Sequence, residues 1–132
     1  MSLNVRVITP DKIIWDAPAE ELILPSSTGQ IGILTGHAPL LTALDIGVMR
    51  IKSITGWTFI VLMEGFAEIE DNKVTILCNG AEEGSSIDLP TTQKELENII
   101  LLVESATTKK EKIKATIELR KSKARLQAVT GR

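Results

Sequence analysis

The sequence predicts an α+β fold, with an antiparallel β-sandwich over residues 1–86 followed by an antiparallel two-helix hairpin over residues 87–132. Three observations support this fold class. In the first part, short apolar runs alternate with turn residues, as expected for many half-buried strands. In the second part, the apolar residues follow the spacing of a helix. The charge is also unevenly distributed along the chain. Residues 1–105 carry six basic and fifteen acidic residues (net charge −9), and residues 106–132 carry nine basic and two acidic residues (net charge +7).

The first strand shows the two-residue period clearly, because Leu3, Val5 and Val7 alternate with polar residues. Proline and aspartate within residues 9–12 then predict a turn. Further strands are predicted at residues 13–15, 21–24, 31–34, 47–52, 57–63, 66–70 and 73–78. Short strands separated by Gly, Pro and Asn favour a sandwich or barrel over a βαβ arrangement.

The first helix is predicted from an apolar stripe at i, i+3, i+4 and i+7, formed by Leu96, Ile99, Ile100 and Val103. Thr92 and Glu95 have the spacing of a capping box, which would start the helix there. Asp88, which stands before Pro90, is the alternative start. A short link at residues 105–110 makes this helix and the next an antiparallel hairpin.

The second helix is predicted to run to about Val129 and has two narrow apolar seams. One seam contains Ile113, Ile117, Ala124 and Ala128, and the nearly opposite seam contains Ala115, Leu119, Ser122, Leu126 and Val129. One seam can pack on the first helix, and the other on the sandwich or on a partner. Both seams are short and have small side chains, so burial of either seam contributes only about a few kcal/mol of binding free energy. We therefore expect docking of the hairpin to be reversible.

No catalytic or metal-binding constellation is predicted. One cysteine and one histidine cannot supply a disulfide or a usual zinc site. The glycine-rich residues 29–36 lack the Gly-Lys-Ser/Thr end of a phosphate-binding loop. His37 would need a nucleophile and an orienting group, and the sequence does not place Ser26, Ser27 or Asp45 beside it. Cys78 is expected to be a buried apolar residue. We therefore expect neither catalysis nor a bound cofactor.

No segment is expected to cross a membrane, since the longest apolar runs, residues 59–63 and 99–103, have five residues each and a spanning helix needs about twenty. The start of the chain has neither a secretory apolar region nor a transit segment. The basic residues 106–132 predict an acidic partner, and the alternative is a solvated helix face.

Several segments resemble the epsilon subunit of F-type ATP synthase. The most specific is Gly36-His37-Ala38-Pro39 within residues 36–44, preceded by the glycine-rich stretch. The resemblance continues through residues 47–51, 65–69 and 74–77 and into the basic helix, so it covers essentially the whole chain. Residues that look most like the chloroplast or cyanobacterial members are 3–7, Thr9-Pro10, Trp15-Asp16 and 45–47.

The resemblance implies a rotor component and not a catalyst. In that family the sandwich binds the gamma subunit and touches the polar loops of the membrane c-ring, so that gamma rotation is coupled to the ring. Gln30 and His37 match the ring-contact positions. The hairpin acts as a brake on ATP hydrolysis when it extends along gamma toward the alpha and beta catalytic subunits. The implied location is the thylakoid membrane, peripherally, on the stromal or cytoplasmic side.

The basic helix gives that brake a physical basis, because its cations would be attracted to acidic loops of the catalytic beta subunits. Lys121, Lys123 and Arg125 are the expected regulatory residues. Some relatives bind ATP through an Ile/Leu-Asp-x-x-Arg-Ala motif, and here Asp88 is present but Thr91 and Thr92 replace the Arg-Ala pair. We therefore expect no tight nucleotide binding, and we expect Asp88 to cap the helix instead.

The alternative function is an adaptor that binds an acidic partner or nucleic acid through the basic helix. Nucleic acid is disfavoured, because residues 106–132 contain no aromatic side chain for base stacking and the rest of the chain is acidic.

Overall fold

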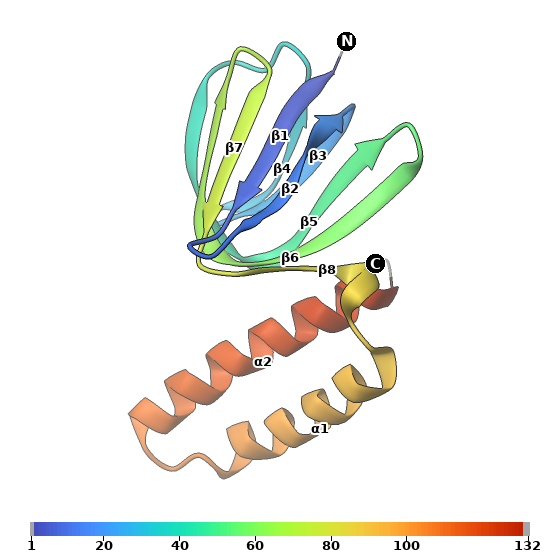
Figure 1. The fold of residues 1–132 in the computed structure, drawn as a ribbon. Helices are drawn as coiled ribbons and strands as arrows, with labels where there is room; N and C mark the ends of the chain where they lie inside the picture. The colour runs from blue at the N-terminus through green and yellow to red at the C-terminus, as the bar shows by residue number, and fades with distance from the viewer. Residues whose placement is uncertain (1, 131–132) are drawn as a thin grey trace.

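The computed structural model describes residues 2–130 and confirms the predicted fold class (Figure 1). In this view the β-sandwich lies at the top, and the two-helix hairpin lies beneath it. The elements in chain order are β1 (Leu3–Ile8), β2 (Ile13–Ala19), β3 (Glu21–Ser26), β4 (Gly29–Leu34), β5 (Leu40–Ser53), β6 (Gly56–Glu70), β7 (Lys73–Cys78), β8 (Ala81–Glu83), the 3-10 helix η1 (Gly84–Ser86), α1 (Leu89–Ser105) and α2 (Lys109–Thr130).

The strands form one continuous sheet in the order β2-β1-β7-β6-β5-β3-β4, with β8 added beside β6. The long β5–β6 hairpin belongs to both layers of the sandwich, and the sheet folds over along it (Figure 1). Neighbouring strands are antiparallel, as predicted, except that β1 and β7 pair in parallel. The short strand β8 and the early start of β5 at Leu40 were not predicted.

The predicted strands 57–63 and 66–70 are one strand, β6, with a bend where the prediction left a gap. Glu64 has a φ of +78° at this bend. Gly65 follows it, and a Cβ on Gly65 would lie 2.0 Å from the backbone oxygen of Leu77 on β7. Only glycine allows the two strands to approach this closely. The gap between the two predicted strands is therefore a bend within one strand and not the end of a strand.

Alternating side chains from both layers fill the core of the sandwich. In β1, Leu3, Val5 and Val7 are buried while the residues between them are exposed. The opposite layer contributes mainly large aliphatic residues from β3 to β6, namely Leu22, Leu24, Ile33, Met49, Ile51, Ile60 and Leu62. Cys78 is buried in this core as predicted, and burial raises the pKa of its thiol.

The first helix begins at the alternative start. Asp88 is its N-cap and accepts a hydrogen bond from the Thr91 amide, and Pro90 lies in the first turn. The capping box predicted at Thr92 is wrong, because Thr92 is buried in the first turn and its hydroxyl donates to the Asp88 carbonyl. Ile100, which was placed on the apolar stripe, is 40% exposed.

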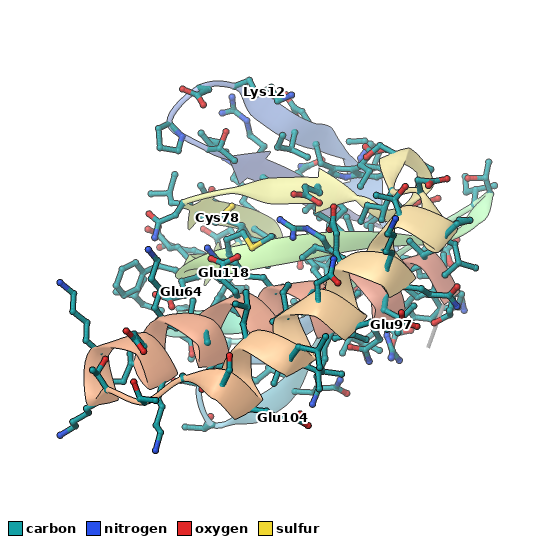
Figure 2. The ribbon with its side chains drawn as sticks, turned by 90° about the horizontal axis from the view of Figure 1, so that it is seen from below. Lys12, Glu64, Cys78, Glu97, Glu104 and Glu118 are labelled. Atoms are coloured by element: carbon teal, nitrogen blue, oxygen red, sulfur yellow. The ribbon has the colours of Figure 1, made fainter. Side chains whose placement is uncertain are left out.

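The second helix lies between the sandwich and α1 (Figure 1). Ala124 and Ala128 on α2 join a second apolar cluster with Ile46, Val48 and Val61 of the sandwich. Figure 2 shows the hairpin from below, with the exposed Glu97 and Glu104 on α1. The first predicted seam is therefore only half buried: Ala124 and Ala128 pack on the sandwich, whereas Ile113 and Ile117 are 53% and 36% exposed. Of the second seam, Ala115 lies beside α1.

Candidate functional site

The first predicted contact residue, Gln30, lies near the start of the edge strand β4. It is exposed and stands opposite Pro25 of β3. Because β4 is the last strand of the sheet, its outer edge and the Gln30 side chain are open to a partner.

The second predicted contact residue, His37, follows the other end of β4. The loop before it is fixed by the Gly36 amide, which donates to Asn72 Oδ1 over 2.7 Å, and Gly36 has a φ of +82°. The imidazole Nδ1 lies 2.7 Å from the Ala38 carbonyl oxygen. Four strand residues separate Gln30 from the end of β4, which is about 13 Å of extended chain. The structure therefore does not bring the two residues together.

A catalytic role for His37 has no support in this geometry. Ser26 and Ser27 lie at the Gln30 end of β4, and the Ser26 hydroxyl is bonded within its own turn. Asp45, the third group considered, binds Arg120 instead. Over residues 2–130 there is no cluster of three or more His, Cys, Asp or Glu side chains able to hold a metal ion.

The three predicted regulatory cations of α2 have different surroundings. Lys121 Nζ lies 3.6 Å from Glu118 on the same helix. Lys123 is exposed and forms no ion pair with the residues that the structure describes. Arg125 binds Glu82 on β8 with two hydrogen bonds of 3.1 Å each. The three cations are therefore not equally available to a partner, because Arg125 is already bound to the sandwich.

A second contact between α2 and the sandwich was not predicted. Arg120 Nη2 lies 2.5 Å from Asp45 Oδ1, at the bend of β5. The hydrogen bond from Arg120 lowers the pKa of Asp45, and the bond from the Ile46 amide lowers it further, although burial opposes both. The division of charge along the sequence predicted attraction between an acidic and a basic part, but it could not identify the pairs.

Asp88 caps α1 as predicted. Its carboxylate accepts bonds from both the amide and the hydroxyl of Thr91, and these bonds lower its pKa. The two threonines that replace the Arg-Ala pair therefore have structural roles, Thr91 at the cap and Thr92 in the first buried turn.

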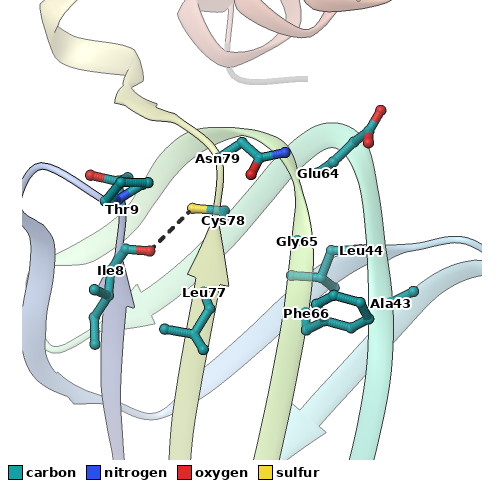
Figure 3. A pocket seen from close by; sticks show the side chains of 11 residues that line it. Ile8, Thr9, Ala43, Leu44, Glu64, Gly65, Phe66, Leu77, Cys78 and Asn79 are labelled. Carbon is teal, nitrogen blue, oxygen red and sulfur yellow. Dashed lines mark hydrogen bonds between the residues drawn. The ribbon is translucent and has the colours of Figure 1, made fainter.

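An exposed apolar row on the sandwich was missed. The side chains of Ala43, Phe66, Leu77 and Ile8 stand side by side across β5, β6, β7 and β1. Phe66 is 58% exposed and Leu77 is 54% exposed. They line an open hollow of about 580 Å³, whose floor includes the 3.7 Å contact between Cys78 Sγ and the Ile8 carbonyl (Figure 3). Leu77 was the available signal, because it is apolar at an outward-facing position of β7.

These features define a class of protein: a small β-sandwich with an open apolar face that carries a basic helix in a two-helix hairpin. Residues 2–84 match the family model described as ATP synthase, Delta/Epsilon chain, beta-sandwich domain. The chain is 78% identical over 129 residues to the chloroplastic ATP synthase epsilon chain of Emiliania huxleyi, covering 98% of this chain and 99% of that one. It is 54% identical over 134 residues to the ATP synthase epsilon chain of the cyanobacterium Thermosynechococcus vestitus, covering 99% and 97%.

The fold also matches a chain in the mitochondrial ATP synthase structure of Euglena gracilis, with a TM-score of 0.82 at 22% identity, covering 93% of this chain and 78% of that one. The chain belongs to the epsilon-chain family of ATP synthase. It is thus a non-catalytic subunit of that complex, and the relatives do not support the adaptor alternative.

No helix between residues 2 and 130 is long and apolar enough to cross a membrane.

Proposed function

We propose that this chain is a rotor subunit of the central stalk, which couples the gamma subunit to the c-ring and restrains ATP hydrolysis through its hairpin. Residues 1–86 carry the coupling function, and residues 87–132 carry the regulatory function. The observation that supports this proposal most directly is the exposed apolar row, because large apolar side chains gathered on one face of a small subunit are typical of a contact with a permanent partner.

The gamma subunit is the proposed partner for this row. Phe66 and Leu77 supply the apolar centre, and aromatic side chains at the centre of an interface contribute strongly to binding. The hollow beside them contains one carboxylate, Glu64, so a mostly apolar surface with a basic or polar rim would fit it.

The c-ring contact is proposed at the ends of β4. Gln30 is exposed at one end, and the His37 loop is held in shape at the other. A contact with both residues would extend along the free edge of β4. Gln30 is uncharged, so this contact would depend on hydrogen bonding and not on ion pairing.

The brake is proposed to act through the exposed cations of α2, with Lys123 the most available of the predicted three. In the extended state these cations would bind acidic loops of the alpha and beta catalytic subunits. One relative is named as a chloroplastic ATP synthase epsilon chain, which supports a complex of the chloroplast type. The proposed location of this complex is the thylakoid membrane, where the chain is held peripherally by its neighbours on the stromal or cytoplasmic side.

The test is binding of the full chain to a gamma-containing complex prepared without it. Phe66→Asp should weaken binding at least about tenfold, because it places a charge at the centre of the apolar row. Leu101→Asp is the matched control, since Leu101 is 62% exposed and belongs to α1, which α2 separates from the sandwich (Figure 1). Equal binding of both variants and the wild type would refute the proposed gamma contact.

A further inference from the structure

The second helix is held on the sandwich by a narrow strip of apolar contacts. On that side of α2, Ala124 and Ala128 are the buried residues, and they pack on Ile46, Val48 and Val61. Alanine side chains remove little apolar surface from water, so this strip by itself attaches the helix weakly. The remaining attachment has to come from polar contacts and from the fit of the backbone.

Two ion pairs lie beside this strip. Arg120 binds Asp45 at the bend of β5, and Arg125 binds Glu82 on β8. Both arginines come from α2, and both acids come from the sandwich, on separate strands. Among residues 2–130 these are the ion pairs that join the hairpin to the sandwich, since the other two lie within one part.

The last turn of α2 also fits closely against η1. A Cβ on Gly84 would lie 2.9 Å from the Ala128 carbonyl oxygen and 3.3 Å from the Phe59 carbonyl oxygen. Both neighbours are backbone atoms, which cannot rotate away as a side chain can. A side chain at position 84 would therefore push the end of α2 off the sandwich without any change in charge.

We propose that Arg120 and Arg125, bound to Asp45 and Glu82, form a latch that sets the fraction of molecules with a docked hairpin. We call these four residues the arginine latch. The latch arginines hold the hairpin down, whereas Lys123 on the same helix is free to bind a partner. The two kinds of cation on α2 therefore have opposite effects on release.

The exposure of the latch makes it adjustable. The side chains of Arg120 and Asp45 are 43% and 40% exposed, and those of Arg125 and Glu82 are 24% and 38% exposed. Partly exposed ion pairs are weakened by salt, and each changes an equilibrium by up to about fivefold. Loss of both pairs would then shift the equilibrium toward the released hairpin, while the small apolar strip stays unchanged.

The experiment measures hydrogen exchange of the α2 backbone amides in the full chain. Asp45→Asn and Glu82→Gln each remove an acid of the latch and keep every cation of α2. Each variant should exchange up to about fivefold faster, and the double variant faster still. The charge swap Glu82→Arg with Arg125→Glu should restore slow exchange. Lys123→Gln is the matched control and should exchange like the wild type.

Two further measurements separate the latch from docking itself. Wild-type exchange should rise between about 0.05 M and about 0.5 M salt, and the Asp45→Asn/Glu82→Gln variant should lose most of this dependence. Gly84→Ala should speed exchange at every salt concentration, because its effect is steric.

Unchanged exchange in the double variant, or an undiminished salt dependence, would overturn the latch. So would unchanged exchange in Gly84→Ala, because α2 would then not be docked in solution. The regulatory consequence of the latch rests on the proposed function, but the exchange experiment needs no other subunit. A missing gamma contact would therefore leave these results intact, and a missing latch would leave gamma binding intact.

Discussion

Arg125 and Glu82 are joined by two parallel hydrogen bonds, Nε to Oε2 and Nη2 to Oε1, each 3.1 Å long. This two-point contact fixes the orientation of α2 on β8 as well as its distance, which a lysine in place of Arg125 could not do. A cation expected from the sequence to bind a partner is thus occupied within the chain while the hairpin is docked.

Removing the acid of this pair should strengthen inhibition of ATP hydrolysis. In Glu82→Gln the hairpin is released more often and still carries all its cations, so more molecules can reach the inhibited state. The expected gain in inhibition is at most about fivefold, equivalent to about 1 kcal/mol. The measurement is the ATPase rate of a gamma-containing complex at a series of concentrations of the added chain.

Lys123→Ala is the comparison in the same assay and should change inhibition in the opposite direction. Lys123 makes no ion pair within residues 2–130, so its loss removes a partner contact without releasing the hairpin. Inhibition should fall by up to about fivefold. A change of the same sign in both variants would contradict the division of the cations into two roles.

The sequence predicted the fold class and most strands because one face of each strand is buried, which leaves a two-residue period such as that of β1. It divided β6 into two strands at Glu64 and Gly65, although the β5–β6 pairing continues on both sides of them. The site was predicted only in part. Asp88 is a local cap and is visible in sequence, whereas the pairing of Arg120 with Asp45 spans 75 residues and depends on the fold.

Gly65→Ala should destabilise the sandwich by at least about 2 kcal/mol. The new methyl group would lie 2.0 Å from the Leu77 carbonyl oxygen, so β6 and β7 would have to separate at the bend. The measurement is urea unfolding followed by circular dichroism. Gly32→Ala is the matched control, because nothing lies within 4 Å of a Cβ at that strand position. Equal stability of the two variants would contradict the close approach.

The isolated chain should not bind ATP in the micromolar range. Thr91 is engaged with the Asp88 carboxylate and Thr92 is buried, so neither position offers a cation to a phosphate. Titration calorimetry of the full chain with ATP, with and without magnesium, is the measurement. Heat of binding at micromolar concentrations would show that other cations of the hairpin, such as Arg125, form a phosphate site.

Docking of α2 should be insensitive to pH near neutrality and should weaken in acid through Asp45. The hydrogen bond from Arg120 holds the pKa of Asp45 below its ordinary value of 3.8, so the docked state favours the ionised carboxylate. This contribution is fully present above 3.8 and is lost as the pH falls through the lowered pKa. Between about pH 5 and pH 8 the Asp45–Arg120 pair should therefore contribute a constant amount.

The two tryptophans report on this change, because Trp15 and Trp57 line the same hollow as Ala128 and Val129 at the end of α2. Their emission should shift to the red as the hairpin leaves, and in the wild type the shift should begin below about pH 4. Asp45→Asn cannot titrate, so the difference between its profile and the wild-type profile isolates Asp45 from the other carboxylates. Identical acid profiles for the two proteins would show that Asp45 does not contribute to docking.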